Sequence, residues 1–417
     1  MDLIFKRLGL QKKFFSILIL TGGLLIFNSL NFSQTLPKTH PQDVGISPDR
    51  LSCLHSLIQD AIQNRDFPGA VVLVARKGKI VFHRAYGESQ WLPEHHSMEK
   101  SMIFDLASLT KPVATATSIM MLVEKGKIRL WDKVKDFIPS FIPYQSEKEK
   151  KKKEARIWHL LTHTSGLPSY TDVGKIKEKY GSSCSLESLM KHIAHLPKTD
   201  PPGESFRYSC LGYITLHSIL KKVTGINLAQ FSEKHIFKPL GMNRTFFNPP
   251  SHLHAQCVPT ELIEGKPLKG TVHDPLARLQ GGVSGNAGLF STAKDLAVFS
   301  QMILNKGGYK GTRILSPLTV KRMTSIYPQA FFSGRGLGWD LESPYATAGG
   351  DIFGSRSFGH TGYTGTSLWI DPETETMVIF LTNRVHPHDK GSVVSLRSKV
   401  ANVVASSIMK KGNRKSF

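Results

Sequence analysis

The strongest strand signals in this sequence lie near its two ends rather than beside one another. Residues 70–75 and 80–86 are rich in β-branched side chains and flank a short Gly-containing turn, which is the pattern of a β-hairpin. A second pair of strands, 366–370 and 377–382, is predicted around the turn residues Asp371-Pro372-Glu373-Thr374. We expect the two ends of the chain to share one mostly antiparallel sheet, so the chain must leave this sheet and return to it.

Between these strands the sequence carries mainly helical patterns. Residues 157–250 read as helices broken by Pro and Gly, and amphipathic helices are predicted at 49–64 and 393–409. The order of elements predicts an α/β class of the α+β type: a mostly antiparallel sheet flanked by helices, with an inserted all-helical lobe. The expected domain covers residues 44–417, with an α/β lobe at about 44–130 and 285–410 and a helical lobe at about 131–284. A cleft between the lobes is the expected place for a binding site.

The first 35 residues have the pattern of a targeting segment. Four basic residues between 6 and 13 precede the apolar stretch 14–27, which matches a signal-peptide core and is shorter than the roughly 20 residues of a membrane span. Extending that stretch to residue 32 reaches the length of a span only by including three polar residues. Signal peptide and N-terminal membrane anchor both remain open. Either predicts an exported protein, periplasmic or anchored to the cytoplasmic membrane and facing outward, because the positive flank stays inside.

The charge balance favours contact with anionic surfaces. The chain holds 54 Lys and Arg against 32 Asp and Glu, a formal net charge of +22. No basic stripe interleaved with aromatic residues and no nucleic-acid module is found, so we expect no nucleic-acid partner and favour contact with the cell wall or a membrane surface. The charge run at 147–154 is expected to be solvated surface.

The four cysteines indicate neither a zinc site nor a disulfide scaffold. Cys53, Cys184, Cys210 and Cys257 are widely spaced, with no CxxC pair. Buried free thiols are expected, although one disulfide stays open. The histidines show no metal spacing and no HExxH motif occurs, so no metal and no cofactor are expected.

One Ser-x-x-Lys motif stands out by its context. The pattern occurs six times, starting at Ser97, Ser108, Ser188, Ser218, Ser291 and Ser407. Only Ser108 opens a long apolar helix, predicted for 107–124, where the unpaired N–H groups of the first turn favour negative charge on the serine oxygen. Lys111 lies on the same helical face, within reach of that oxygen. Ser291 is instead expected to be the N-cap of the helix that starts at 292–295.

Two interpretations of Ser108 and Lys111 follow. In the first, Ser108 is a nucleophile and Lys111 its base, which requires a neutral Lys111 whose pKa is lowered by burial or by a neighbouring cation. In the second, Ser108 is only an N-cap and Lys111 a surface charge. The GxSxG elbow of other serine hydrolases is absent, because residues 282–286 carry Asn where the last Gly should stand.

The segment 104–113 (FDLASLTKPV) resembles the nucleophile region of class C β-lactamases, low-molecular-weight penicillin-binding proteins and related esterases. Four further stretches match family segments in the expected order: 159–168 (HLLTHTSGLP), 237–242 (FKPLGM), 281–295 (GGVSGNAGLFSTAKD) and 337–339 (LGW). The resemblance extends over nearly the whole chain after residue 44. It implies acyl transfer, with Ser108 attacking a carbonyl and Lys111 as the base.

The family's second motif, Tyr-x-Asn, is similar to Tyr208-Ser209-Cys210 in this chain. The resemblance implies that Tyr208 assists proton transfer between Ser108, Lys111 and the leaving group. Cys210 departs from the family pattern, in which an Asn amide binds the substrate and orients the lysine. A thiol is a weak donor and acceptor and cannot replace both functions, so the substitution argues against true β-lactamase activity.

The third motif, Lys-Thr-Gly, is similar to His360-Thr361-Gly362. The resemblance implies that the backbone N–H of Tyr363, together with the N–H of Ser108, forms the oxyanion hole. His360 replaces the usual lysine, and if protonated it could still meet a substrate carboxylate. The alternative is that His360 is simply a polar residue of the strand.

Three functions remain open from the sequence. The first is a serine hydrolase directed at D-alanyl-D-alanine peptides or related to β-lactamases, and the second is a carboxylesterase on the same scaffold. The third is a non-catalytic protein that binds penicillin or peptidoglycan. In each case the partner is a small molecule or peptide whose carbonyl meets Ser108.

Overall fold

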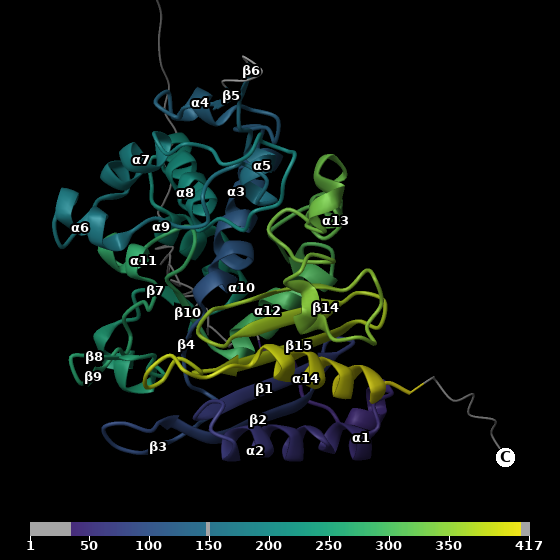
Figure 1. Ribbon diagram of the computed structural model, residues 1–417. Coiled ribbons are helices and arrows are strands. Elements are labelled where there is room, and N and C mark those ends of the chain that lie inside the picture. The colour runs from purple at the N-terminus through teal and green to yellow at the C-terminus, as the bar shows by residue number, and fades with distance from the viewer. Residues whose placement is uncertain (1–34, 147–150, 410–417) are drawn as a thin grey trace, which may run out of the picture. The chain divides into compact units, whose positions relative to one another are not determined.

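The computed structural model describes residues 35–146 and 151–409 (Figure 1). The predicted targeting segment lies outside the described residues except for its last position, and so do residues 147–150 of the charge run. No helix within the described ranges is long and apolar enough to cross a membrane.

The two ends of the chain form one antiparallel six-stranded sheet, as the sequence predicted. Its spatial order is β13-β14-β15-β1-β2-β3, so β1 from the front of the chain pairs with β15 from the back, for example Leu73 opposite Ile379. The strands are β1 Gly69–Arg76, β2 Lys79–Gln90, β3 His96–Ser97, β13 Phe358–Thr361, β14 Ser367–Asp371 and β15 Thr376–Thr382. The side chain of Asp371 accepts hydrogen bonds from the backbone N–H groups of Glu373 and Thr374, which fixes the predicted turn between β14 and β15.

Both faces of the sheet are buried, and alternate residues of β1 belong to different cores. Val71 and Leu73 pack in the large core, whereas Val72 and Val74 pack in a second core on the opposite face. Helices α1 (Pro48–Ser52), α2 (Leu54–Gln63) and α14 (Val394–Ser406) supply residues to the second core, and α12 (Ala293–Leu304) covers the other face (Figure 1). The sheet is thus enclosed between two helical layers, which confirms the α/β class.

The large core continues into the helices of the middle of the chain. Helix α8, with buried residues along most of its length, contacts α3, α4, α5, α7 and α9. The helices of this region are α3 Thr117–Glu124, α4 Val134–Phe137, α5 Ile157–Leu161, α6 Val173–Tyr180, α7 Leu186–Ala194, α8 Cys210–Thr224, α9 Leu228–Ser232, α10 Lys238–Leu240 and α11 Pro275–Leu279, and α13 Pro317–Met323 follows α12.

Short strands and turns connect these layers. A three-stranded sheet has the order β4-β10-β7, formed by β4 Phe104–Asp105, β10 Leu289–Ser291 and β7 Phe246–Phe247. The small hairpins are β5 Tyr144–Ser146 with β6 Lys151–Lys153, β8 Leu262–Ile263 with β9 Lys266–Pro267, and β11 Gly308–Tyr309 with β12 Thr312–Arg313. The described part of the charge run therefore includes a strand, in addition to the expected surface loop. Short 3-10 turns lie at Pro41–Val44, Ala107–Leu109, Ser251–Gln256, Pro328–Ser333 and Ala346–Gly349.

Three local predictions were wrong in detail. The helix predicted for 49–64 is divided at Cys53 into α1 and α2. The helix predicted for 107–124 is a 3-10 turn, then a π-helical turn at Lys111–Ala116, then α3. Ser291 is not an N-cap: it ends β10, and Thr292 caps α12 by accepting the backbone N–H of Asp295.

All four cysteines are free. Cys184 and Cys257 are buried, as expected for structural thiols, and Cys210 is half-buried. Cys53 is exposed, contrary to the expectation of buried thiols, because it stands at the junction of α1 and α2 on the outer layer.

The packing of the sheet predicts a large difference between two leucine substitutions. Leu73 is fully buried in β1, so Leu73→Ala should lower the free energy of unfolding by about 2–5 kcal/mol through lost burial and the remaining cavity. Leu318 is 79% exposed, so Leu318→Ala should change stability by no more than about 0.5 kcal/mol. Urea unfolding of the two variants measures the difference, and similar losses in both would contradict the assigned core.

Candidate active site

Ser108 lies in a tight turn whose shape is fixed by a buried carboxylate. Ala107 has a φ of 46°, a left-handed conformation that costs energy for a residue with a Cβ. The Asp105 side chain accepts the Ala107 N–H at 2.8 Å and the His273 N–H at 2.7 Å, which holds the turn in this shape. Burial raises the pKa of Asp105, and the two backbone hydrogen bonds act in the opposite direction. The strained turn presents the half-buried Ser108 side chain to the cleft.

Lys111 is fully buried and points at Ser108. Its Nζ donates to Ser108 Oγ at 2.8 Å and to the backbone carbonyl of Asn286 at 2.9 Å, and the Cys210 Sγ lies at 3.5 Å. The structure therefore rules out the interpretation of Lys111 as a surface charge. The π-helical turn that begins at Lys111 carries the side chain into this cluster.

Tyr208 lies over the same cluster, just before helix α8. The next residue, Ser209, is the N-cap of α8, and its backbone N–H donates to Nδ1 of His163 at 3.0 Å. The His163 ring stacks on the Tyr208 ring with their centroids 4.2 Å apart. The Tyr208 side chain interacts with both Ser108 and Lys111, and the Lys111 Nζ lies 5.0 Å from the centroid of its ring. Serine, lysine, tyrosine and the Cys210 thiol thus form one connected polar cluster.

The protonation of this cluster differs from that required by the simplest mechanism, in which a neutral Lys111 is the base. Burial raises the pKa values of Tyr208 and Cys210, and the charge of Lys111 acts in the opposite direction on both. Burial lowers the pKa of Lys111, but the anionic forms of Cys210 and Tyr208 outweigh it and the pKa is raised. The lowered pKa that a free lysine base requires is therefore not found: Lys111 is an ammonium in the resting site and donates to Ser108.

His360 and Thr361 end strand β13 beside the Ser108 turn, and Gly362 follows directly. A side chain at Gly362 would collide with the backbone carbonyl of Leu106, so glycine allows the strand to approach the turn closely. The hydroxyl of Thr366 bonds the same carbonyl at 3.1 Å and ties β13 and β14 to the turn. The Tyr363 backbone N–H makes no hydrogen bond to any described residue, which leaves it available to a ligand.

The surroundings of His360 disfavour the protonated ring that contact with a substrate carboxylate would require. The ring is buried, and its Nδ1–H donates to the Thr361 carbonyl at 2.8 Å. Burial, reinforced by the cations Arg335 and Lys111, holds the pKa of His360 well below its ordinary value. His360 is therefore a neutral imidazole whose Nε2 carries a lone pair, and it cannot act as the cation for a substrate carboxylate.

Arg335 is the cation that sequence reasoning missed. Its guanidinium is fully buried, lies 3.0 Å from Asp340, and lies 5.8 Å from the centroid of the Tyr208 ring. Nε and one terminal nitrogen of Arg335 have no hydrogen-bond partner among the described residues. Arg335 therefore brings unused donors to the wall of the cleft, at a position two residues before the Leu337-Gly338-Trp339 segment.

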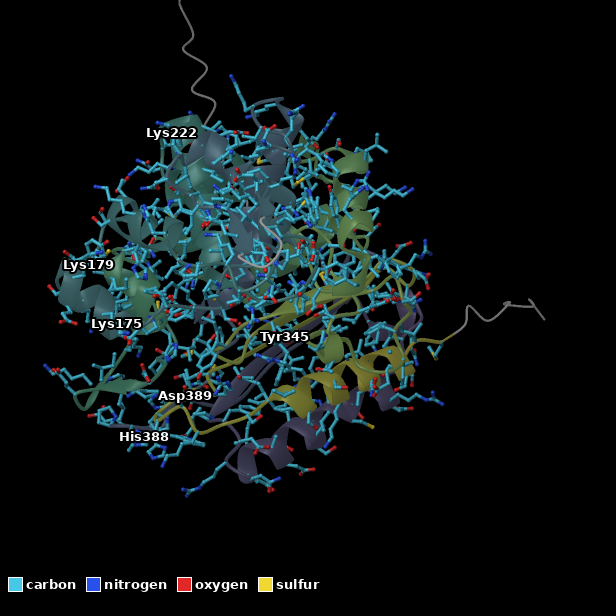
Figure 2. The ribbon with its side chains drawn as sticks, turned by 45° about the horizontal axis from the view of Figure 1, so that its top comes forward. Lys175, Lys179, Lys222, Tyr345, His388 and Asp389 are labelled. Carbon is cyan, nitrogen blue, oxygen red and sulfur yellow. The ribbon has the colours of Figure 1, made fainter. Side chains whose placement is uncertain are left out.

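The cleft has a volume of about 380 Å³ and brings together most of the predicted site residues. Its lining includes Ser108, Tyr208, His360, Thr361, Gly362, Tyr363, Arg335, Asp340 and Tyr345, and Arg384, Gly391 and Arg397 close one side. Lys111 and Cys210 lie behind this lining and contact it from within the protein. Figure 2 shows Tyr345 in the middle of the view and the exposed Lys175, Lys179 and Lys222 away from it, on α6 and α8.

Several residues of this site, among them Asn286, Arg335 and Tyr345, lie outside the motifs recognised as catalytic. Asn286 supplies the carbonyl that holds Lys111, and its side-chain oxygen accepts a hydrogen bond from the Ser284 hydroxyl at 2.7 Å. It stands inside the family-like segment 281–295, which was the one available signal for it. Arg335 and Tyr345 belong to no motif, because they reach the cleft only through tertiary folding.

Comparison with known proteins identifies a family by sequence and a shared fold by structure. The family model "Beta-lactamase" matches residues 54–400. A Salmonella heidelberg (strain SL476) protein named "Putative D-alanyl-D-alanine carboxypeptidase" is 33% identical over 394 residues, covering 87% of this chain and 90% of that protein. The Salmonella typhimurium protein of the same name is 32% identical over the same shares of the two chains.

Two solved structures show the same fold. "EstCE1, a hydrolase with promiscuous acyltransferase activity" superposes with a TM-score of 0.69 at 24% identity, over 86% of this chain and 99% of that one. The octameric penicillin-binding protein homologue from Pyrococcus abyssi has a TM-score of 0.65 at 24% identity, over 86% of this chain and 78% of that one.

The polar cluster predicts that Cys210 controls the pH at which Ser108 becomes reactive. The anionic form of Cys210 raises the pKa of Lys111, so Cys210→Asn should lower that pKa and move the alkaline rise in reactivity to lower pH. The measurement is the rate of Ser108 labelling by a fluorophosphonate as a function of pH. Cys184→Ala, which removes a buried thiol outside the cluster, serves as the control and should leave the profile unchanged. An identical profile for Cys210→Asn would contradict the coupling.

Proposed function

The chain belongs to the beta-lactamase family of serine hydrolases, and we propose that it is an exported hydrolase that acts through an acyl-enzyme on Ser108 and cleaves peptides ending in D-alanyl-D-alanine. The observation that carries this proposal is the 2.8 Å hydrogen bond between Lys111 Nζ and Ser108 Oγ, at a cleft that also presents Tyr208. Export is supported by the basic and apolar pattern of residues 1–35.

The first half of the reaction forms a bond between Ser108 Oγ and the substrate carbonyl carbon. The serine proton passes to Lys111 once Lys111 has released its own, and Tyr208, which interacts with both groups, relays protons toward the leaving group. The carbonyl oxygen becomes an oxyanion that the N–H groups of Ser108 and Tyr363 receive, an arrangement that typically contributes about 3–4 kcal/mol. The intermediate then breaks its bond to the leaving group, which takes up a proton. Water repeats these steps to release the acyl group.

The resting ammonium of Lys111 gives this mechanism a definite pH dependence. Only the form in which Lys111 has lost its proton can accept the proton of Ser108, so turnover should rise with pH through the raised pKa of Lys111. The buried carbonyl of Asn286 holds Lys111 in place in both protonation states.

Arg335 is the residue we assign to the terminal carboxylate of such a peptide. A planar guanidinium with unused donors suits a carboxylate, whereas the neutral His360 has only a lone pair to offer at Nε2. Asp340 beside Arg335 orients the guanidinium and neutralises part of its charge when no substrate is present.

A carboxylesterase is the second candidate. The neutral His360 and the thiol of Cys210 remove the charge and the amide that peptide-directed relatives use, while the acyl-transfer cluster around Ser108 is kept. An ester needs neither group to react, because its alcohol leaves more readily than an amine.

Replacement of Ser108 tests the shared step of both candidates. Wild-type protein should hydrolyse p-nitrophenyl acetate, release D-alanine from a D-Ala-D-Ala peptide and retain fluorescent penicillin on Ser108, and Ser108→Ala should lose all three. Ser97→Ala, which alters another Ser-x-x-Lys sequence in the exposed β3, should behave as wild type. Turnover of the ester alone would favour the esterase, retention of penicillin without turnover would favour a binding protein, and activity surviving in Ser108→Ala would refute the assignment.

Replacement of Arg335 by Lys separates recognition of a carboxylate from chemistry. Arg335→Lys keeps the charge opposite Asp340 but loses the planar pair of donors, so KM for the D-Ala-D-Ala peptide should rise about tenfold. Hydrolysis of p-nitrophenyl acetate, which has no carboxylate, should change little. A thermal melt checks that the variant is folded, and equal losses on both substrates would exclude the assigned role.

A further inference from the structure

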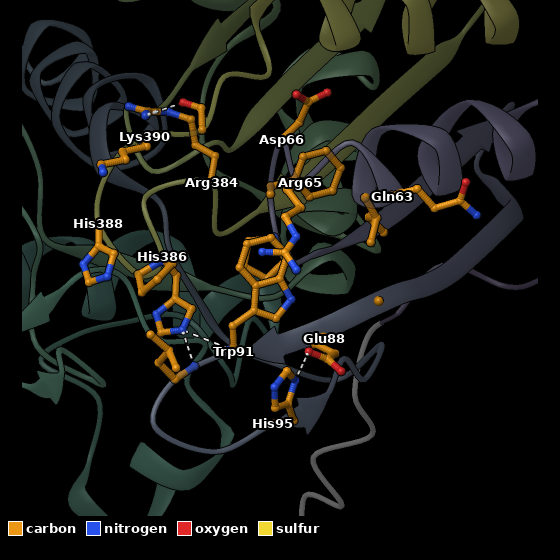
Figure 3. Close-up of a pocket in the computed structure, with 17 residues that line it drawn as sticks. Gln63, Arg65, Asp66, Glu88, Trp91, His95, Arg384, His386, His388 and Lys390 are labelled. Atoms are coloured by element: carbon orange, nitrogen blue, oxygen red, sulfur yellow. Dashed lines mark hydrogen bonds and ion pairs between the residues drawn. The ribbon is translucent and has the colours of Figure 1, made fainter.

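A second cavity of about 700 Å³ lies beside the active-site cleft (Figure 3). Its walls come from three separate segments: the end of α2 with the residues up to 68, the end of β2 with the following turn, and the loop after β15. Arg384 and Gly391 of that loop line both the cavity and the cleft. The two spaces therefore meet at one shared wall.

Buried hydrogen bonds fix the walls of this cavity. Nε2 of His386 accepts the backbone N–H groups of Trp91 at 3.0 Å and of Leu92 at 3.2 Å, and its Nδ1 donates to the Thr260 carbonyl at 2.8 Å. Burial lowers the pKa of His386, which keeps the ring neutral and able to accept these bonds. Asn383 donates to the Ser89 carbonyl at 2.6 Å and ties the same two segments a second time. The cavity is thus a defined part of the fold.

The shared wall is ordered as well. Arg384 donates to Asp389 at 2.7 Å and to the Gly391 carbonyl at 3.0 Å, and its guanidinium lies 4.4 Å from the centroid of the Tyr363 ring. The Tyr363 hydroxyl donates to the same Asp389 at 2.7 Å. Tyr363 also carries the N–H group proposed for the oxyanion, so a substrate held at Ser108 lies next to this wall.

The lining of the cavity combines apolar surface with cations. Trp91 is half-buried and Leu92 is 41% exposed, so both offer apolar surface to a ligand. The side chains of Arg65 and Lys390 are exposed and make no hydrogen bond or ion pair among the described residues, and Figure 3 shows the two residues on different sides of the cavity. Asp66 contributes one carboxylate to the same lining.

The remaining charged groups of the lining are already paired. Glu88 is bonded to His95 at 2.7 Å, and Arg384 is bonded to Asp389. The unpaired charges of the lining are the two cations Arg65 and Lys390 and the one anion Asp66. The cavity therefore combines an excess of positive charge with apolar surface.

We propose that this cavity binds the part of the substrate remote from the reacting carbonyl, and that this part is an aromatic or aliphatic group ending in an anion. The inference rests on the proposed hydrolase function and adds the substrate class to it. Apolar surface at Trp91 and Leu92 binds the hydrocarbon portion, because removing such surface from water is favourable. Arg65 and Lys390 attract the terminal anion.

Esters of different length test the proposal through a comparison within one enzyme. The probes are p-nitrophenyl acetate, which is too short to pass the shared wall, p-nitrophenyl octanoate, and the mono-p-nitrophenyl ester of decanedioic acid. A second series of acetate esters carries equally long alcohol groups and tests whether the leaving group occupies the cavity. A higher kcat/KM for long chains, on either the acyl or the alcohol side of the ester, supports the proposal. In the wild type, kcat/KM should increase with chain length and be highest for the acid-terminated chain.

Two sets of variants assign the preference to the cavity. Trp91→Ala should lower kcat/KM for the long esters roughly tenfold and leave p-nitrophenyl acetate unchanged. The double variant Arg65→Gln with Lys390→Gln should raise KM severalfold for the acid-terminated ester but not for the octanoate. Trp131→Ala, which removes a tryptophan that is 48% exposed and lines neither space, is the matched control and should affect no ester.

The outcomes separate this inference from the proposed function. A Trp91→Ala variant that loses activity equally on short and long esters, or on none, would overturn the cavity's role even if Ser108 is the nucleophile. If the wild type hydrolyses no ester and Ser108 takes no label, the proposed function fails, and the cavity is then tested by decanedioate quenching of tryptophan fluorescence. Quenching lost in Trp91→Phe would support the binding site, and its absence in the wild type would refute it.

Discussion

The burial of one ammonium group, that of Lys111, is the constraint on which the arrangement of this site depends. A buried charge is costly unless it is paired and hydrogen-bonded, and here the partners come from separate parts of the chain. Ser108 is three residues away, Asn286 belongs to the turn before β10, and Cys210 begins α8. The buried ammonium is stabilised only when all three groups contact it together. The sheet side and the helical side of the cleft must therefore pack against each other before the charge is compensated. The polar cluster therefore joins the two sides of the site as well as equipping it for proton transfer.

The parts of the fold that sequence reasoning predicted are those set by short-range patterns. Strands β1 and β15 are runs of β-branched and aliphatic residues, and alternation within β1 sends Val72 and Leu73 to opposite cores. The register between the two ends could not be read from either run alone, since it depends on pairing across most of the chain. The N-cap of α12 was displaced by one residue because Ser291 and Thr292 are both competent caps, and only the extension of β10 decides between them.

The candidate site likewise has features that could be predicted from the sequence and features that could not. The proximity of Ser108 and Lys111 follows from their spacing at the start of a helical segment, so it could be anticipated. The charge of His360 could not, because it depends on burial of the ring and on Arg335 and Lys111, which only tertiary structure brings near it. Arg335 itself stands in no recognised motif and was therefore missed. The sequence thus predicted that Ser108, Lys111 and Tyr208 lie together, whereas their protonation states are properties of the folded cluster.

Neutral His360 and cationic Arg335 together explain how an altered motif can remain compatible with an anionic substrate. A lysine at position 360 would place a third buried cation beside Lys111 and Arg335, and each would lower the stability of the charged form of the others. An imidazole avoids this repulsion by staying neutral and keeping its Nδ1–H on the Thr361 carbonyl. Under the proposed function, Arg335, which Asp340 partly neutralises, provides the positive charge that the family's lysine supplies. Substitutions at 360 and 335 are consequently coupled, because a cation at one position is tolerated only when the other is neutral or paired with an acid.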